Sequence, residues 1–546
     1  MRSRDLSVLS EGDHDLLVIG GGVYGLAIAA DAASRGLRVA LVEAADFGSG
    51  VSFNHQKTAH GGLRSLSTGH LGRARQSIRE RRALARIAPR LLRPLPFIVG
   101  TYRSLVKSRL ALRAGFKLDG WLARHRNDGI EPELHLPPAR LVSRAATLKL
   151  FPGISRDGLT GGAMWYDYQI VEADRLTLAF AESADAHGAN VANYAEATAA
   201  LREAGRIAGM RVRDRLSGEE CDVRAALTIN AAGARAGEVM RGFGVNRPMR
   251  LLKAMNLVTR KPASDIALAA PDATGRMLTL VPWRGRALVG TSQSSTFREP
   301  GDTRVLRSEV ETFVADANAA FPALQLTMDD VTLVHRGIVP AVDGRGGMPE
   351  LLPAPQILDH TTDGASGAMT VVGVKFTTAR GVAARVVSGA ARRIGKRVPP
   401  SRTDRQPMPG AGIADHEALA IETARAVHLE LAPPTIRHLI GVYGERCVPI
   451  IKLMAEQSAW RAPLTAGLPN VGAEVVHAIR HEMAHTLADV VIRRTGLGSG
   501  SHPGSAVVQA AAGIAGDALG WTPSRAAQEI AEIDRFYQID ETSPQR

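Results

Sequence analysis

Apolar positions near the start of the chain form short runs separated by glycine. The run DLLVIG (15–20) is bounded by glycine and is typical of a buried strand. The alanine-rich stretch GLAIAADAASRG (25–36) predicts a helix that ends at Gly36, a suitable C-terminal cap. The following run, LRVALVE (37–43), predicts a second buried strand. Strand, glycine turn, helix and strand in this order indicate a parallel βαβ unit.

Similar strand-like runs return much later in the chain. AALTINAAG (225–233) and AMTVVGVKF (368–376) are apolar with glycine turns, so we assign them to the same sheet and expect a discontinuous domain. Two inserted stretches separate its pieces. Residues 71–125 are basic and predicted to be helical, whereas residues 245–330 contain runs that suit an antiparallel sheet covering a ligand.

The last part of the chain has a different pattern. A proline-rich linker spans residues 398–412, and the stretch from His416 to Tyr537 has an almost wholly helical pattern. This pattern predicts an all-α C-terminal domain.

Composition narrows the class of protein. The chain has 546 residues, of which 45% are hydrophobic and 22% charged, as in an ordinary globular protein with two or three domains. Two cysteines require no disulfide framework and favour a reducing compartment. Residues 1–15 lack the apolar core of a signal peptide, and the longest apolar run is too short and glycine-rich to span a bilayer. We expect a cytoplasmic protein that is not an integral membrane protein.

Positive charge is concentrated in one stretch. The formal net charge is +13, and residues 64–126 contain 16 Lys or Arg against only Glu80 and Asp119. Such a surface attracts anionic lipid, nucleic acid or anionic metabolites. Nucleic acid is disfavoured because no recognition module is evident and aromatic residues make up only 4%. The alternative is that these arginines are solvated helix faces without a partner.

Gly20, Gly22 and Gly25 form a GxGxxG motif at the start of the predicted helix. In such a motif the glycines allow a tight turn, a close approach to pyrophosphate, and helix packing on the strand. Glu43 ends the second strand, 18 residues after Gly25, and can accept hydrogen bonds from the adenosine ribose. The combination predicts a dinucleotide site, the alternative being a glycine-rich turn without a ligand.

The motif alone does not distinguish FAD from NAD. A motif near the start, a discontinuous sheet domain and a late GVK turn favour FAD, because a flavin enzyme surrounds one FAD with segments from both ends of its chain. We therefore predict an α/β fold with a discontinuous FAD-binding Rossmann-like domain, an α+β substrate or cap domain of antiparallel strands and an all-α C-terminal domain. The predicted boundaries are 14–90, 161–244 and 331–397 for the FAD-binding domain, 91–160 for a basic helical insertion or cap, 245–330 for the substrate domain, 398–412 for the linker and 413–540 for the helical domain.

Motifs along nearly the whole chain resemble those of FAD-dependent glycerol-3-phosphate dehydrogenases and oxidases. IGGGVYGLAIAADAASRG (19–36) is similar to that family's signature, and QKTAHGGLRSL (56–66) is similar to its SKLIHGGLRYL. Five further segments follow in the family's order: RIAPRLLRPLPFIV, GGAMWYDYQIVEADRL, GRMLTLVPWRGRALVGT, VVGVKFTTAR and AEVVHAIRHEMAHTLADVVIRRTGL.

The resemblance implies oxidation of the secondary alcohol of glycerol 3-phosphate to dihydroxyacetone phosphate, by hydride transfer to flavin N5. Electrons would then pass to quinone. His60 is the candidate base, since an imidazole accepts protons near neutral pH, and Arg64 offers a planar fork for phosphate. The implied catalytic residues are His60, Arg64, Arg336 and Lys375, and the implied substrate-binding residues are Arg64, Ser65, Lys253, Asn256 and Lys375.

The predicted cofactor contacts combine the dinucleotide motif with residues implied by the resemblance. Gly61 and Gly62 are expected to let the backbone pass close beneath the flavin ring. The full set is Gly20, Gly22, Gly25, Glu43, Ser52, Lys57, His60, Gly61, Gly62, Ala232, Gly233, Gly373 and Thr377, with no metal site. Simpler roles stay open for some of these side chains: His60 could cap a helix, Arg64 could be a surface arginine, and Lys253 could extend along the surface.

The sequence departs from the family's pattern at the substrate pocket. Ser65 replaces a tyrosine, Asn256 replaces a histidine, and Val339 and Leu358 stand where the family has arginines. Each charge-assisted hydrogen bond to an anion contributes about 1.5–3 kcal/mol, so losing two arginines is costly. Arg336, three positions before Val339, is a candidate to fill the gap.

Three hypotheses follow. The first is a glycerol-3-phosphate dehydrogenase that delivers electrons to membrane quinone or another acceptor. In it, the basic stretch docks on the inner face of the cytoplasmic membrane and residues 104–122 form an amphipathic face, although they could equally pack on the FAD domain. The second is an enzyme on the same scaffold that oxidises another hydroxy- or amino-bearing anion. The third is a flavin-bound regulatory or structural protein with degraded catalysis. None of them involves nucleic acid.

Overall fold

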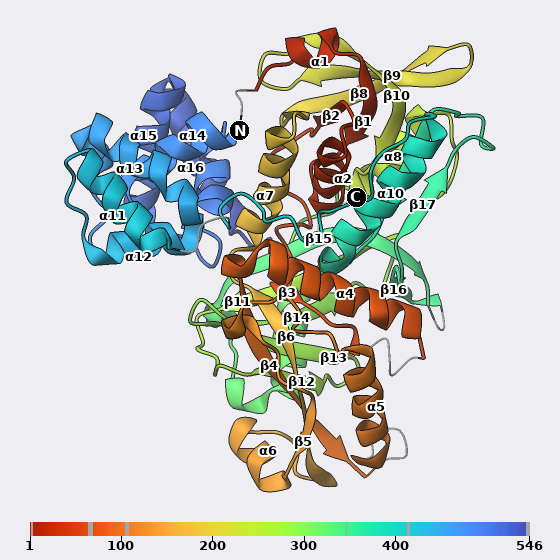
Figure 1. The fold of residues 1–546 in the computed structure, drawn as a ribbon. Coiled ribbons are helices and arrows are strands. Elements are labelled where there is room, and N and C mark those ends of the chain that lie inside the picture. Colours follow the sequence, from red (N-terminus) through yellow and green to blue (C-terminus); the bar gives the residue numbers. More distant parts are fainter. Residues whose placement is uncertain (2–3, 64–68, 104–108, 345–346, 412–414, 542–546) are drawn as a thin grey trace. The chain divides into compact units, whose positions relative to one another are not determined.

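A computed structural model describes residues 1, 4–63, 69–103, 109–344, 347–411 and 415–541 (Figure 1). The predicted site residues Arg64 and Ser65 lie outside the described residues. The chain folds into two compact units. The first comprises Met1–Phe53, Glu172–Leu251 and Val339–Phe536, and the second comprises Asn54–Val171, Leu252–Ile338 and Tyr537–Arg546.

The first unit is built on a mixed sheet of eight described strands, whose parallel centre is β18, β10, β1, β2 and β7. Strand β1 is buried along its whole length, as expected for a parallel strand covered on both faces. The strands are β1 (His14–Ile19), β2 (Val39–Val42), β7 (Asn190–Ala192), β8 (Ala195–Glu203), β9 (Arg206–Asp214), β10 (Glu220–Asn230), β17 (Gln356–Asp359) and β18 (Ala368–Val372). The strands β17 and β9 add to this centre in antiparallel orientation, and β8 pairs with β9.

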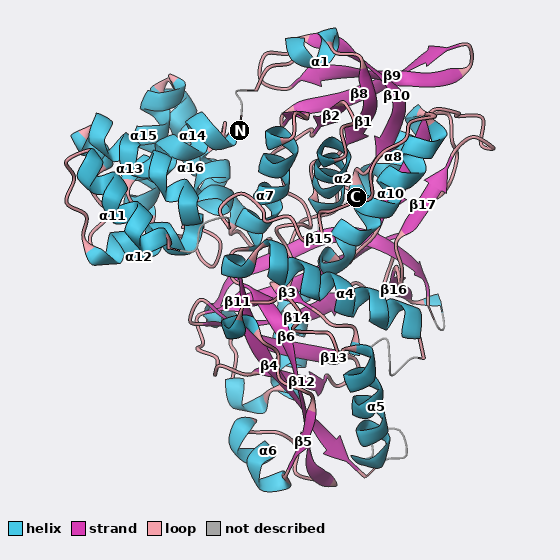
Figure 2. Ribbon diagram, viewed as in Figure 1, coloured by secondary structure: helices cyan, strands magenta, loops and turns pink. Residues whose placement is uncertain are grey.

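Helices cover this sheet, as the cyan ribbons of Figure 2 show. The alanine-rich α2 (Val23–Ser34) contacts both α7 (Ala173–Ala186) and α10 (Ala379–Arg393), and its small residues permit that close packing. The unit also contains α1 (Ser7–Glu11) and α8 (Ala236–Gly242). The predicted βαβ unit and the two late strands are thus confirmed in a single sheet.

The C-terminal part of the first unit is helical, as predicted. Its helices are α11 (His416–Ala426), α12 (Pro433–Tyr443), α13 (Cys447–Glu456), α14 (Gly472–Glu482), α15 (Ser505–Leu519) and α16 (Pro523–Phe536). A short π-helical segment, Asp489–Arg494, lies between α14 and α15. Leu439, Ile450, Ile451 and Val476 are fully buried in the shared core of these helices. We refer to residues 415–536 as the helical segment.

The second unit is built on a largely antiparallel sheet that is continuous with β15 (Val331–Asp343) and β16 (Pro349–Leu351). Its other strands are β3 (Thr58–Ala59), β4 (Leu92–Tyr102), β5 (Arg140–Val142), β6 (Leu159–Ile170), β11 (Leu251–Thr259), β12 (Ala267–Pro271), β13 (Met277–Trp283) and β14 (Arg286–Gln293). Its helices are α4 (Leu71–Ile87), α5 (Arg109–Leu122), α6 (Arg144–Leu150) and α9 (Arg307–Ala320). Strands β13 and β14 pair in antiparallel orientation, in agreement with the antiparallel sheet predicted for residues 245–330.

One part of the sequence prediction is wrong. Residues 71–125 were expected to be helical, but Leu92–Tyr102 form strand β4, which pairs with β6 along its length. Pro94 and Pro96 lack the N–H donors that a helix interior requires. They lie outside the short section, Phe97–Val99, where β4 also pairs with β12, so the strand tolerates them.

The two units divide the chain differently from the predicted domain boundaries. Residues 54–90, predicted with the first FAD-binding piece, belong to the second unit, because β3 pairs with β6 there. The helical segment belongs to the same compact unit as the parallel sheet. Among the described residues, no helix has the length and apolar composition required to cross a bilayer.

Candidate active site

The turn between β1 and α2 requires glycine for steric reasons. Gly20 has a φ of +110°, and a Cβ there would lie 2.6 Å from the carbonyl oxygen of Ala231. A Cβ on Gly25 would lie 1.8 Å from the carbonyl oxygen of Gly20. Gly22 is the N-cap of α2 and provides no capping side chain. This geometry brings the backbone at the helix N-terminus into position for a pyrophosphate.

Two predicted cofactor residues are bonded to this turn. The Glu43 carboxylate accepts the Gly21 N–H at 2.6 Å and the Ala45 N–H at 2.8 Å. Burial raises the pKa of Glu43. A carboxylate has about four acceptor sites, so these two bonds leave capacity for ribose hydroxyls. The hydroxyl of Ser52 accepts the Val23 N–H at 2.9 Å, in the first turn of α2.

The segments after β10 and β18 converge on the same turn. Ala231 donates its N–H to the Ile19 carbonyl oxygen, and the Gly233 backbone turns with a φ of +58°. The Tyr24 hydroxyl donates to the Lys375 carbonyl oxygen at 3.1 Å. A Cβ on Gly373 would lie 2.4 Å from that hydroxyl. Burial raises the pKa of Tyr24 to about 12, so it remains a neutral donor at physiological pH.

The predicted cofactor residues of the first unit therefore follow the carboxyl ends of β1, β2, β10 and β18. They are Gly20, Gly22, Gly25, Glu43, Ser52, Ala232, Gly233, Gly373 and Thr377, with Lys375 beside them. In parallel sheets, nucleotides bind outside these ends. The glycines that a Cβ would obstruct and the carboxylate at the ribose position fit the ADP portion of FAD.

In the second unit, His60 follows β3 and is half-exposed. Its Nε2 lies 2.8 Å from the Thr58 hydroxyl, and its Nδ1 lies 3.3 Å from Oδ2 of Asp167 on β6. Asp167 is buried, and its Oδ2 also accepts a hydrogen bond from the indole N–H of Trp165 at 3.3 Å. An ionised carboxylate only accepts hydrogen bonds, so Nδ1 carries a proton, and in the neutral imidazole Nε2 is then the acceptor.

Asp167 is kept ionised by its neighbours. Its Oδ1 accepts the Gly61 N–H at 2.6 Å and a hydrogen bond from the Arg81 guanidinium. Burial opposes ionisation, but Arg81 and the hydrogen bond from His60 hold the pKa of Asp167 below its usual value. Arg81 comes from α4 and also donates to the Tyr166 carbonyl oxygen at 2.8 Å.

The two glycines of the HGG turn have a role within the second unit. A Cβ on Gly61 would lie 2.2 Å from a terminal nitrogen of Arg81. Gly62 has a φ of +83°, and a Cβ there would lie 2.8 Å from the Cβ of Ser77 on α4. Packing of the turn against α4 is therefore sufficient to require glycine at position 62, whereas at Gly61 a Cβ would have to displace the Arg81 guanidinium from its place beside Asp167.

Two other predicted residues, Lys57 and Lys253, have partners inside the second unit. The Lys57 ammonium lies 5.4 Å from the ring centroid of Trp283 and its side chain is fully buried. The Lys253 ammonium donates to Glu309 at 2.6 Å and to the Arg304 carbonyl oxygen at 3.0 Å. These bonds replace the surface position considered for Lys253.

Asn256 is also buried. Its Oδ1 accepts from the Thr291 hydroxyl at 2.8 Å, and a Cβ on Gly290 would lie 1.9 Å from the same oxygen. Asn256 therefore packs against β14, the neighbouring strand.

The suggestion that Arg336 fills the gap at Val339 does not fit the strand. Both residues lie in β15, and side chains three positions apart in a strand point to opposite faces. Arg336 donates a hydrogen bond to the Val334 carbonyl oxygen at 3.3 Å, and burial lowers the pKa of its guanidinium. Val339 itself is buried.

Sequence reasoning missed Asp167 and Arg81, the two residues that hold His60. A signal was present: Asp167 is an acidic residue within the strand-forming aromatic run MWYDYQ, where burial of a charge requires a partner. Nothing in the sequence indicated that Arg81 was this partner, because it is one of many arginines in a basic stretch.

Comparisons with known proteins define the class. A family model described as FAD dependent oxidoreductase matches residues 15–388, which include both glycine turns. A model described as the C-terminal domain of alpha-glycerophosphate oxidase matches residues 401–526. The chain is an FAD-dependent oxidoreductase, which confirms the predicted cofactor.

Individual relatives narrow the assignment. A glycerol-3-phosphate dehydrogenase from Synechocystis sp. is 30% identical, with 96% of each chain covered. Glycerol-3-phosphate dehydrogenase 2 from Mycobacterium tuberculosis is 30% identical over 95% of this chain and 87% of its own. The X-ray structure of the glycerol-3-phosphate dehydrogenase from Bacillus halodurans complexed with FAD has a TM-score of 0.76 at 22% identity, covering 99% of this chain and 98% of that chain, so the fold is shared. The chain belongs to the glycerol-3-phosphate dehydrogenase family.

Proposed function

We propose that the enzyme oxidises the secondary alcohol of glycerol 3-phosphate to the ketone and passes the electrons to quinone. The observation that carries the proposal is the half-exposed His60, whose Nδ1 is bonded to the ionised, buried Asp167. Bound FAD supplies the hydride acceptor. The protein supplies the base: with Nδ1–H donated to Asp167, Nε2 takes the hydroxyl proton in place of its bond to Thr58.

The test is anaerobic reduction of the enzyme-bound flavin, measured as the loss of its visible absorbance. Glycerol 3-phosphate is expected to bleach the flavin, whereas lactate and 2-hydroxyglutarate are not. Turnover with a soluble quinone analogue then tests the acceptor separately. Bleaching by lactate or 2-hydroxyglutarate alone would contradict the proposed substrate. Bleaching by none of the three would favour the regulatory hypothesis or an anionic substrate outside this series.

A second candidate substrate is another hydroxy- or amino-bearing anion. Two observations favour it. Val339 and Leu358 are apolar where the family has arginines. In addition, the Lys253 ammonium, a candidate phosphate ligand, is already paired with the Glu309 carboxylate. Fewer free cations weaken a dianionic phosphate site more than a carboxylate site. The same bleaching series distinguishes the two candidates.

Lys375→Ala is expected to weaken substrate binding more than FAD binding. Its backbone carbonyl oxygen receives the Tyr24 hydrogen bond, which the substitution retains, while the proposed cation for the substrate is lost. In stopped-flow flavin reduction, the substrate concentration at half-maximal rate should rise about tenfold or more, as expected for one charge-assisted hydrogen bond. Purification of the variant without FAD would contradict this assignment.

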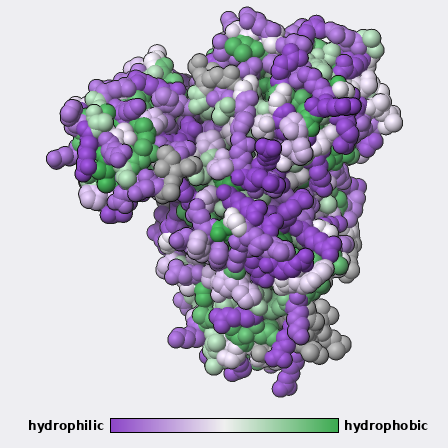
Figure 3. Space-filling model, viewed as in Figure 1, coloured by the Kyte–Doolittle hydropathy of each residue, from purple (hydrophilic) through white to green (hydrophobic). Residues whose placement is uncertain are grey.

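We also propose peripheral binding to an anionic membrane through α4 and α5. The surface over α4 is strongly hydrophilic (Figure 3), and that helix carries Arg73, Arg75, Arg79, Arg82 and Arg86. On α5, Trp121 is 56% exposed, and the guanidinium groups of Arg75 and Arg124 lie 5.7 and 5.6 Å from its ring centroid. An exposed tryptophan among arginines suits a lipid headgroup layer on the cytoplasmic side.

Sedimentation with liposomes tests this surface. The enzyme is expected to sediment with vesicles containing phosphatidylglycerol at low salt and to be released as salt is raised. Trp121→Ser combined with Arg75→Gln should abolish sedimentation and leave flavin reduction unchanged. Equal sedimentation of the wild type with neutral vesicles would contradict an electrostatic surface.

A further inference from the structure

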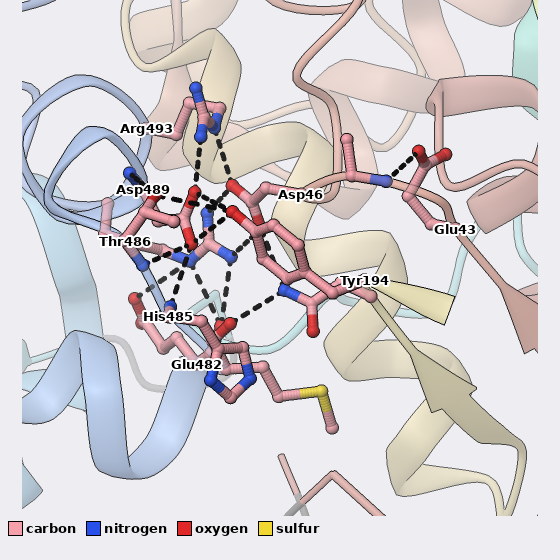
Figure 4. Close-up of polar contacts among 12 residues, drawn as sticks. Glu43, Asp46, Tyr194, Glu482, His485, Thr486, Asp489 and Arg493 are labelled. Carbon is pink, nitrogen blue, oxygen red and sulfur yellow. Dashed lines mark hydrogen bonds and ion pairs between the residues drawn. The ribbon is translucent and has the colours of Figure 1, made fainter. Parts of the chain in front are cut away.

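A buried ionic cluster joins the parallel sheet to the helical segment within the first unit (Figure 4). At its centre, the Asp46 carboxylate accepts four hydrogen bonds. Oδ1 accepts from Arg494 at 2.7 Å and from Asn193 at 3.1 Å, while Oδ2 accepts from Arg494 at 2.9 Å and from Arg493 at 2.6 Å. The side chains of Asp46 and Arg494 are 0% and 1% exposed.

The charge at this carboxylate is permanent at physiological pH. Burial alone would raise the pKa of Asp46, but Arg494 and Arg493 lower it to about 2. Asp489 adds a second carboxylate that accepts from Arg493 and from the Tyr194 hydroxyl, the latter at 2.8 Å. Asn193 donates to the Met483 carbonyl oxygen as well, at 2.8 Å. Each arginine and each carboxylate in the cluster therefore has a buried partner of opposite charge.

Asp46 lies only three residues after Glu43, in the loop that follows β2. We call residues 43–48 the ribose loop. It is bonded twice to the dinucleotide turn: the Gly21 N–H donates to the Glu43 carboxylate at 2.6 Å, and the Gly48 N–H donates to the Gly21 carbonyl oxygen at 2.9 Å. A Cβ on Gly21 would lie 2.7 Å from the Phe47 ring, so the loop also packs on the turn.

The other side of the ribose loop is held by the last residue of β7 and the residues that follow it. The Glu43 N–H donates to the Ala192 carbonyl oxygen at 2.9 Å, and the Tyr194 N–H donates to the Ala45 carbonyl oxygen at 2.9 Å. Tyr194 then bonds Asp489 of the helical segment. Thus the same few residues contact the dinucleotide turn at one end and the helical segment at the other.

We propose that Asp46 is a positioning residue for FAD: through Arg493 and Arg494, the helical segment holds the ribose loop and so orients Glu43 toward the adenosine ribose. The helical segment thereby contributes to FAD affinity through the ribose loop. An ion pair that served only to attach the helical segment could lie anywhere along its contact with the rest of the first unit. Asp46, by contrast, lies in the loop that carries the proposed ribose-binding carboxylate, Glu43.

A matched control exists at the same contact. Arg446 of the helical segment pairs with Glu182 on α7 at 2.9 Å, and Glu182 is also buried. This pair attaches the helical segment to α7, and within the described part of the chain it has no hydrogen bond to the ribose loop. Arg446→Gln should lower thermal stability without changing FAD affinity.

The experiment measures the FAD dissociation constant of full-length holoenzyme by flavin fluorescence on dilution, alongside unfolding by circular dichroism. Asp46→Asn, which keeps the shape and removes the charge, is expected to raise the dissociation constant about tenfold, within the usual range for coupling between two sites. Arg493→Lys, a milder change, should raise it by a smaller factor while the protein remains folded.

A double-variant cycle tests whether Asp46 acts through Glu43. If it does, Asp46→Asn combined with Glu43→Gln should weaken FAD binding no more than Glu43→Gln alone. Additive losses in the double variant would overturn the proposal. An unchanged dissociation constant in Asp46→Asn, or an equal rise in Arg446→Gln, would also overturn it, because either result would leave the cluster with a purely structural role.

Discussion

His60→Ala is expected to retain FAD and to slow reduction of the flavin by glycerol 3-phosphate about 10²–10⁴-fold, the range for loss of a general base. The reason is that Nε2 of His60 is the ring nitrogen left as an acceptor once Nδ1 bonds Asp167. FAD retention is expected because the dinucleotide turn, Glu43 and Ser52 belong to the first unit, whereas His60 belongs to the second. Stopped-flow absorbance under anaerobic conditions measures the rate.

His125→Ala is the control for this prediction. His125 lies in the second unit, as His60 does, with its side chain 59% exposed and its Nδ1 bonded to Asp128 at 2.7 Å. It therefore reproduces a histidine–aspartate pair outside the HGG turn. This variant should reduce flavin at the wild-type rate. A wild-type rate in His60→Ala would remove His60 from the reaction.

The sequence predicted the parts of the fold that depend on local pattern. The buried runs of β1 and β2, the glycine turn and the alanine-rich α2 are adjacent in the chain, and each has a direct physical signature. The helical C-terminal part was evident for the same reason. Strand β4 was missed because prolines and arginines in a basic stretch obscured it, and only its pairing with β6 defines it as a strand.

The candidate site was predictable to the extent that it lies in motifs. Glu43 and the three glycines of GxGxxG follow from spacing, and the structure places them around one turn of the first unit. Their contacts with FAD stay a prediction. Asp167 could not be assigned to His60 from sequence, because 107 positions separate them and only the pairing of β3 with β6 brings them together. Lys253 illustrates the reverse. Its position in the family pattern suggested a substrate-binding role, but its ammonium donates a hydrogen bond to Glu309, 56 positions away.

The second large effect is expected at Asp167. Asp167→Ala leaves the Arg81 guanidinium, which is 8% exposed, without its buried counter-ion, and removes the acceptor that fixes the His60 tautomer. Breaking a buried ion pair from one side costs about 3–5 kcal/mol of unfolding free energy. Denaturant unfolding should show this loss, and flavin reduction should slow as strongly as in His60→Ala.

A second substitution separates stability from positioning. Asp167→Ala combined with Arg81→Met removes both charges of the pair, so much of the lost unfolding free energy should return. Flavin reduction should remain slow in the double variant, because no carboxylate then holds Nδ1 of His60. Recovery of the reduction rate together with stability would mean that Asp167 serves only the fold. Persistent slow reduction in a stable protein would instead identify the carboxylate as the group that orients the base, since the imidazole would be present but free to rotate or to exchange its tautomer.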